Sequence, residues 1–249
     1  MRSTASSVAS RVSATPDLLD WVRGLVSVAF VLLLPLLIIG TSLRGLVTDR
    51  DFMLRGFQDN RVATTTGLDQ AQLRRVADAF VAYFQAAPGQ IQLQVTAFGQ
   101  SRPLFTEREV AHMEEVQGLI QLFLRMQLVA AAVVVIRLAT AVAFDRSAVP
   151  LGRDMLWSTG VMVGLVVLVG FLSLLDFDAL WTRFHQIAFR NDLWQLDPTR
   201  DYLIMLFPEP FWLAATVRMA TSVGLQALLV LVLGLAFVIS PRFLGGRMT

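Results

Sequence analysis

The 249-residue sequence contains no cysteine and no lysine. The absence of cysteine excludes a disulfide framework, a thiol nucleophile and a cysteine-ligated metal. The absence of lysine excludes Schiff-base chemistry and any phosphate-binding loop that depends on a lysine. All 21 basic residues are therefore arginine. Any chemistry in this chain must use other side chains.

Charge is also scarce. Only 16% of the residues are charged, 55% are hydrophobic, and the mean hydropathy is +0.60. This composition is too apolar for a water-soluble domain and predicts that much of the chain lies in a phospholipid bilayer. The high isoelectric point does not indicate a nucleic-acid partner, because the arginines are spread along the chain and interleaved with acids.

Four long apolar stretches are each sufficient for one membrane span, which needs about 20 residues in a helix. We predict spans over residues 21–46, 119–143, 155–175 and 211–239. The apolar run that begins at Leu25 is long for a signal-peptide core and lacks a small-x-small cleavage site after it. It is interpreted as a retained anchor, with a cleaved signal as the alternative.

Four spans place both termini on one side of the membrane. Arginines predominate around the 144–154 connection and in the 240–249 tail, which favours a cytoplasmic location for both. The 1–20 tail is then cytoplasmic as well. Segments 47–118 and 176–210 are predicted to be extracytoplasmic, in a multi-pass protein of the cell (cytoplasmic) membrane.

The first extracytoplasmic segment has its own periodicity. Residues 68–86 are amphipathic at helical spacing, 91–98 alternate as a strand does, and 102–105 can pair with that strand. The predicted fold class is therefore a mainly α membrane protein, with a four-helix transmembrane bundle and a small extracytoplasmic α+β head.

One of the two histidines follows a capping box. Thr106 and Glu109 have the spacing in which each side chain caps the backbone amide of the other residue, so a helix begins there. If the helix runs unbroken into the second span, His112 lies at the outer membrane surface. Glu109 and Glu115 lie on its side of the helix, and a carboxylate there can orient the imidazole.

The other histidine lies in an aromatic segment. Trp181, Phe184 and Phe189 surround His185 in the sequence and suit the headgroup region of a bilayer. Further along, Asp197 and Pro198 predict the start of a short helix that runs through Tyr202 to Leu206 and is ended by Pro208 and Pro210.

Two histidines at one membrane face suit acid–base catalysis, because one imidazole can accept a proton while the other donates one. The structural alternative is that each histidine only bonds a backbone carbonyl at a helix end. Glu109-x-x-His112 is also half of a di-metal carboxylate pattern, but Thr182 stands where the second glutamate would be. We therefore predict no metal and no cofactor.

Several motifs resemble one family. They are Leu104-Phe105-Thr-Glu-Arg-Glu109-Val-Ala-His112-Met113-Glu-Glu-Val116, Phe184-His185-Gln-Ile-Ala-Phe189-Arg-Asn191-Asp-Leu-Trp194-Gln-Leu-Asp197, Asp201-Tyr202-Leu-Ile204 and Phe207-Pro208-Glu209-Pro-Phe211-Trp212. In this order they are similar to the lipoprotein intramolecular transacylase family of small bacterial membrane proteins, and the resemblance covers nearly the whole chain.

The resemblance implies an enzyme that moves the sn-2 acyl chain of a diacylglyceryl-cysteine onto the α-amine of that cysteine, giving a lyso-form lipoprotein. The lipidated N-terminus of bacterial lipoproteins is then the partner, and His112 and His185 are the functional histidines. Such aminolysis needs a base, an acid and donors to the oxyanion. The candidate supporting residues are Glu109, Arg183, Asn191, Trp194 and Tyr202, although Glu109 and Asn191 can instead cap helices.

Two other functions are compatible with the sequence. A non-enzymatic accessory or lipid-binding protein predicts histidines too far apart to share a substrate. A metal-dependent membrane hydrolase or transporter predicts a third ligand that converges on the pair.

Overall fold

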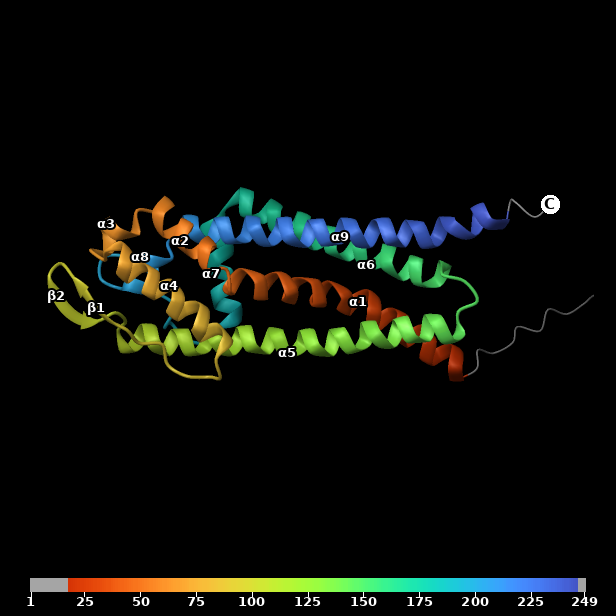
Figure 1. The fold of residues 1–249 in the computed structure, drawn as a ribbon, viewed down its shortest axis with the longest axis horizontal. Coiled ribbons are helices and arrows are strands. Elements are labelled where there is room, and N and C mark those ends of the chain that lie inside the picture. Colours follow the sequence, from red (N-terminus) through yellow and green to blue (C-terminus); the bar gives the residue numbers. More distant parts are fainter. Residues whose placement is uncertain (1–17, 246–249) are drawn as a thin grey trace, which may run out of the picture.

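A computed structural model describes residues 18–245, with side chains described as far as residue 239. Its four longest helices are α1 (Leu18–Val47), α5 (Glu107–Phe144), α6 (Val149–Leu175) and α9 (Glu209–Gly245). All four are long and apolar enough to cross a membrane. They run side by side along the long axis of the molecule (Figure 1). The four predicted spans each lie within one of these helices.

The long helices are packed around α1, which contacts α5, α6 and α9. The α6–α9 pair makes the most extensive contact among the described helices, and two glycines face each other in it. A Cβ atom added at Gly152 would lie 2.8 Å from the Gly234 carbonyl oxygen. Helices in membranes often associate in this way, since small residues let two backbones approach.

The remaining elements form a cap at one end of the bundle, where the amino-terminal turns of α5 join them (Figure 1). These elements are α2 (Arg50–Asp59), α3 (Val62–Thr66), α4 (Gln70–Gln85), β1 (Gln94–Ala97), β2 (Gln100–Pro103), α7 (Phe177–Ala188) and α8 (Tyr202–Leu206). The strands pair antiparallel, with Gln94 opposite Pro103. The predicted amphipathic helix and strand pair of the head are both present.

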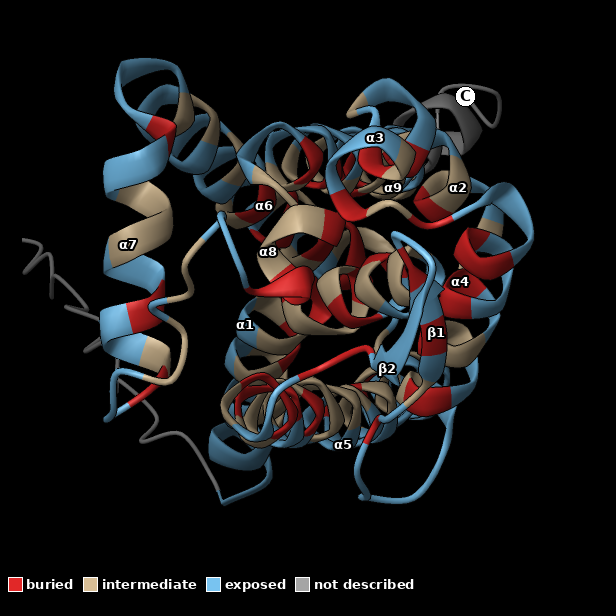
Figure 2. Cartoon of the chain, turned by 90° about the vertical axis from the view of Figure 1, so that its left-hand side faces the viewer, coloured by how far each residue is buried: buried red, intermediate tan, exposed pale blue. Residues whose placement is uncertain are grey.

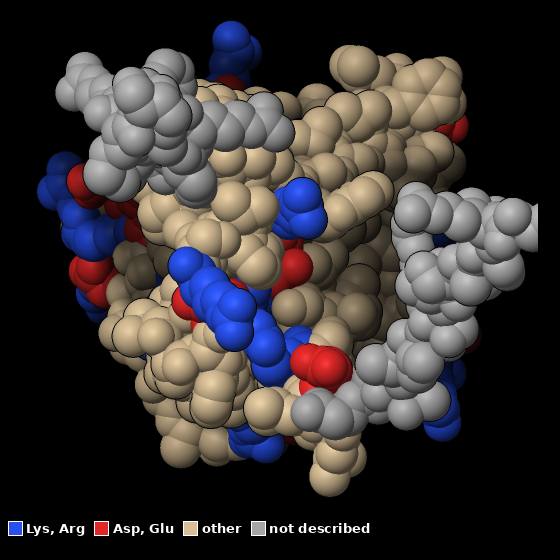
Figure 3. Space-filling view, turned by 90° about the vertical axis from the view of Figure 1, so that its right-hand side faces the viewer, with Lys and Arg blue, Asp and Glu red and all other residues tan. Residues whose placement is uncertain are grey.

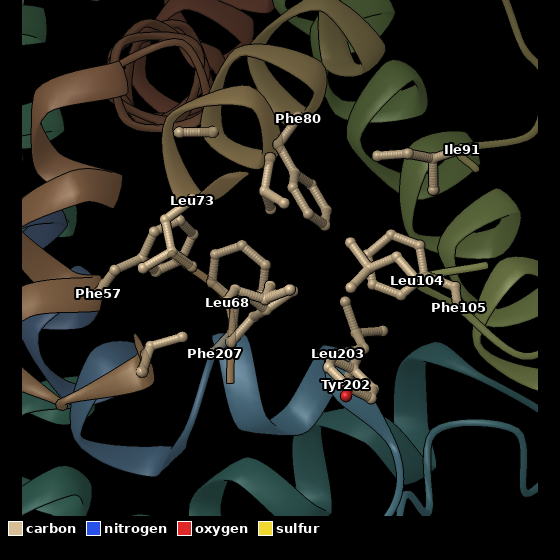
Figure 4. Packing of buried hydrophobic residues seen from close by; sticks show 14 of the residues in the cluster. Phe57, Leu68, Leu73, Phe80, Ile91, Leu104, Phe105, Tyr202, Leu203 and Phe207 are labelled. Atoms are coloured by element: carbon tan, nitrogen blue, oxygen red, sulfur yellow. The ribbon is translucent and has the colours of Figure 1, made fainter. Parts of the chain in front are cut away.

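The cap has a hydrophobic core of its own. Phe57, Phe80, Leu104 and Phe207 come from four segments and meet at its centre (Figure 4). Buried residues are concentrated in the middle of this end of the molecule (Figure 2). Val110 and Met113 of α5 belong to the same core. The first turns of α5 are therefore part of the cap, and the apolar stretch 119–143 that follows lies in the bundle.

Some boundaries differ from the predicted ones because hydropathy marks the apolar part of a helix rather than its ends. α1 begins at Leu18 rather than at residue 21, and residues 1–17 of the predicted tail lie outside the described residues. α6 begins at Val149 rather than at 155, with a proline in its first turn. The predicted 144–154 loop is thus reduced to 145–148. α9 continues through Gly245 into the predicted tail.

The predicted helix start at Asp197 is wrong. Asp197 closes a turn, in which its carboxylate accepts from the Thr199 amide at 2.9 Å, and α8 begins only at Tyr202. Glu109 from α5 accepts the Leu203 amide at 2.6 Å, so a distant carboxylate satisfies the free end of this short helix. Pro210 does not end α8 but lies in the first turn of α9.

Basic and acidic side chains gather at the end of the bundle opposite the cap (Figure 3). Arg137 of α5 is only 3% exposed. Its guanidinium donates to Asp154 of α6 at 2.7 Å and to Asp145 at 3.0 Å. Asp145 also accepts from Arg23 of α1 at 2.6 Å. This ion-pair network ties three helices together at that end.

Candidate active site

His112 and His185 lie beside each other although they come from different elements. His112 is on the cap portion of α5, and His185 is on α7, which starts directly after α6 with Asp176 as its N-cap. α7 runs across the direction of the long helices, from the end of α6 toward the level of α5 (Figures 1 and 2). The two imidazole centroids are 6.0 Å apart, and both residues are buried. This separation allows both rings to contact one reacting group.

Aromatic rings enclose the pair. Phe189 lies 5.0 Å from His112 and 5.7 Å from His185, between centroids. Trp181 lies 4.7 Å from His185 and stacks at 4.6 Å on Trp212 of α9. The rings position the imidazoles and keep water away from them, which strengthens electrostatic interactions in the site.

The hydrogen bond of His185 defines its tautomer. Its Nδ1 lies 2.8 Å from the Trp181 carbonyl oxygen, which can only accept. Nδ1 therefore carries the proton, and Nε2 of the neutral ring has a free lone pair. Burial lowers the pKa of His185 below its ordinary value. His185 is thus neutral at physiological pH and can act as a base through Nε2.

His112 has a different environment. Its Nδ1 is buried and has no hydrogen-bond partner, and the Glu115 Oε2 atom lies 3.9 Å away. Burial lowers the pKa of His112 to about 4, and repulsion by His185 and Arg108 contributes. Both imidazoles are therefore neutral in the resting site.

A cavity of about 430 Å³ opens beside the two histidines. It extends from the cap into the bundle, where Ile39 of α1, Met162 of α6 and Val223 of α9 line it. Among its described lining residues, Thr216 and the tryptophan indoles are the only polar groups besides the two imidazoles. The Thr216 hydroxyl is itself bonded to the Trp212 carbonyl. An apolar chain fits such a cavity, with its polar end at the histidines.

The five predicted supporting residues occupy different places. Glu109 is fully buried and caps α5 and α8. The Tyr202 hydroxyl donates to the Thr66 carbonyl in the cap core. Arg183 is exposed and donates to Gln186. Trp194 lies 5.0 Å from the His185 ring, and Asn191 donates to Glu115 at 2.6 Å. Trp194 thus adjoins the pair, Asn191 is connected to it through Glu115, and Glu109, Tyr202 and Arg183 bond to other groups.

Trp212 and Phe189 adjoin the histidines although neither is among the predicted site residues. The sequence predicts Phe189 as part of an aromatic helical surface, and the structure places it against both imidazoles. Trp212 is the second residue of the predicted fourth span and belongs to one of the motifs that resemble the family. No local signal in the sequence pairs it with Trp181, because the contact depends on how α7 folds back.

Among residues 18–239, no group of three or more histidine, aspartate or glutamate side chains has the geometry to hold a metal ion. The distance between the imidazoles also differs from the wide separation that a purely accessory role predicts.

The lowered histidine pKa values predict a pH-dependent stability. Between about 4 and 6.5 the unfolded chain binds a proton at His112 that the folded protein excludes, so stability rises with pH through this window. Thermal unfolding of the detergent-solubilised protein from pH 4.5 to 7.5 measures this rise. In a His112→Gln variant the rise should be smaller, and an identical pH dependence of the two proteins would contradict the prediction.

Comparison with known proteins gives consistent results. A crystal structure of the membrane integral lipoprotein intramolecular transacylase Lit from Bacillus cereus aligns with a TM-score of 0.77, at 14% identity, over 90% of this chain and 99% of that one. A variant of the same protein aligns with a TM-score of 0.73, over 90% and 97%. An uncharacterized protein of Aquifex aeolicus (strain VF5) is 23% identical over 90% of this chain and 99% of its own length.

The sequence model of lipoprotein intramolecular transacylase Lit matches residues 28–212. This range contains both histidines, the cap, α5 and α6 in full, and most of α1. The chain therefore belongs to the lipoprotein intramolecular transacylase family.

Proposed function

We propose that this protein transfers the sn-2 acyl chain of a diacylglyceryl-cysteine lipoprotein to the α-amine of the same cysteine. The observation that carries the proposal is the pair of buried, neutral histidines at the mouth of an apolar cavity. Ester aminolysis needs a base for the amine proton and an acid for the leaving oxygen. Two imidazoles can share these tasks.

The apolar lining of the cavity favours the binding of an acyl chain. Each methylene group that leaves water for an apolar environment contributes about 0.8 kcal/mol. A chain that passes between Ile39, Met162 and Val223 keeps its tail among apolar residues and its ester beside the imidazoles. Binding the ester and the amine of one substrate together replaces a bimolecular reaction by an intramolecular one.

The proposed reaction requires only the amine and the ester of the substrate and two neutral imidazoles. The amine nitrogen attacks the ester carbonyl, and Nε2 of one imidazole takes the proton that the nitrogen loses. The C–N bond forms, the bond between the acyl carbonyl carbon and the glyceryl oxygen breaks, and the imidazolium returns its proton to the glyceryl oxygen. No covalent enzyme intermediate is required.

We further propose that the reaction occurs at the extracytoplasmic face of the cell membrane, with both termini in the cytoplasm. The arginines near the loop between α5 and α6 support this orientation through the positive-inside rule. The lipidated N-termini of secreted lipoproteins would be accessible from the same face.

Mass spectrometry of lipoproteins from a host that lacks this activity tests the function. Expression of the wild-type chain should convert diacylglyceryl termini to N-acylated lyso-forms of unchanged total mass, and tandem spectra locate the moved acyl group. Lipoproteins that keep only diacylglyceryl termini despite membrane-inserted protein would reject the proposal.

A further inference from the structure

Two buried polar atoms beside the active site lack partners and face each other. They are Nδ1 of His112 and Oε2 of Glu115, which are 3.9 Å apart. This distance is too long for a hydrogen bond. Buried polar groups rarely remain unsatisfied, and a small side-chain rotation would pair these two. Catalytic hydrogen bonds are often long without substrate and shorten when it binds.

The other carboxylate oxygen of Glu115 is already fixed. Asn191, which follows α7, donates from Nδ2 to Glu115 Oε1 at 2.6 Å. The Asn191 side chain is itself held, because its oxygen accepts the Leu193 amide at 3.0 Å. Arg108 of α5 also donates to the carbonyls of Asp192 and Leu193. The segment after His185 is therefore tied back to the helix of His112.

We propose that Glu115 is a positioning residue that holds His112 with its Nδ1 protonated, and that Asn191 fixes Glu115 for this task. This inference rests on the proposed transacylase function. His185 has the same arrangement, since its Nδ1 is bonded to a carbonyl. Both rings then keep Nε2 for the substrate.

The acceptor beside Nδ1 of His112 is the Glu115 carboxylate, whereas the acceptor for Nδ1 of His185 is the neutral Trp181 carbonyl. This difference in charge separates the roles of the two histidines. A carboxylate stabilises an imidazolium more than a carbonyl does. Glu109, one turn before His112, directs its carboxylate to Thr106 and to the Leu203 amide. The charged and titratable groups that interact with His112 are Arg108 and Glu115 on its own helix and His185 from α7. Glu115 is the only anion among them. His112 is thus the imidazole that takes the amine proton, and Glu115 stabilises the charge that results.

The chain offers a direct test because it contains only two histidines. Nitrogen-15 NMR of histidine-labelled, full-length protein in bicelles reports the tautomer and pKa of each imidazole. Glu115→Gln should lower the pKa of His112 and mix its tautomers, while His185 stays unchanged as an internal reference. Asn191→Ala should have the same effect to a smaller degree. Glu114→Gln, at the exposed neighbouring position, is the matched control.

Conversion of lipoprotein is measured on the same variants. Glu115→Gln should slow it by about ten- to a hundredfold, the usual cost of losing a residue that orients a functional imidazole. If the wild type converts lipoprotein and Glu115→Gln alters neither the His112 signals nor the rate, the positioning role is overturned. If the wild type fails to convert lipoprotein, the transacylase function is lost, and altered His112 signals in Glu115→Gln still support the pairing.

Discussion

Alanine in place of either His112 or His185 is expected to slow lyso-form production by about a hundred- to ten-thousandfold, the range that general acid–base groups contribute. The imidazoles are the only titratable side chains among the described residues that line the cavity. Without one of the imidazoles, the site lacks either the base that accepts the amine proton or the acid that protonates the glyceryl oxygen. Conversion is measured by mass spectrometry in a host that lacks the activity.

Loss of activity must be separated from loss of folding, because both rings contact aromatic neighbours. His185→Asn is designed for this purpose. The asparagine amide can still donate to the Trp181 carbonyl as Nδ1 does, but it offers no Nε2. This variant should retain the wild-type unfolding temperature and lose conversion. Gln186→Ala, on the exposed face of α7, is the control that should keep both. Wild-type conversion by His185→Asn would remove His185 from the mechanism.

Replacement of Arg137 by alanine is expected to destabilise the protein by about 3–5 kcal/mol, the usual cost of breaking a buried ion pair on one side. The side chains of Asp145 and Asp154 are only 5% and 15% exposed, and each would lose its bond to the guanidinium. Thermal unfolding in detergent micelles measures the loss. Arg146→Ala, at an exposed position nearby, should leave stability nearly unchanged.

A double variant distinguishes the effect of the buried charge on stability from the effect of side-chain packing. Arg137→Met combined with Asp154→Asn keeps much of the side-chain volume and removes one uncompensated charge. It should recover a large part of the stability that Arg137→Ala loses, because an apolar or neutral replacement avoids the desolvation penalty. If Arg137→Ala unfolds at the same temperature as Arg146→Ala, the network contributes nothing to stability.

Sequence patterns alone predicted much of the fold. Each of the four predicted apolar stretches lies within one long helix. Hydropathy over about 20 residues is a local property, and it is sufficient to predict a helix that can cross a bilayer. The capping box at Thr106 and Glu109 correctly marked the start of α5, since its bonds join neighbours in the chain. Helix ends were less accurate where polar residues such as Arg153 continue a helix beyond its apolar part.

Other features depend on contacts between residues distant in the chain. Asp197 has the local chemistry of a helix N-cap, yet α8 begins at Tyr202 and its end is satisfied by Glu109. Glu109 is predicted both as a cap and as a supporting residue, but its capping of a second helix, α8, is not predictable from the sequence. Which carboxylate satisfies the amino-terminal end of α8 depends on how α5 packs against α8. Sequence periodicity does not predict that packing.

The sequence by itself indicated a membrane protein with four helices long and apolar enough to cross a bilayer, a mixed cap, and two histidines as candidate acid–base groups, because composition, periodicity and capping are local. Only the tertiary structure decided that the imidazoles lie 6.0 Å apart beside an apolar cavity, and that Asn191 holds Glu115 next to His112. These arrangements arise when α7 folds back across the bundle, and the long-range packing that fixes them leaves no signal in either segment alone.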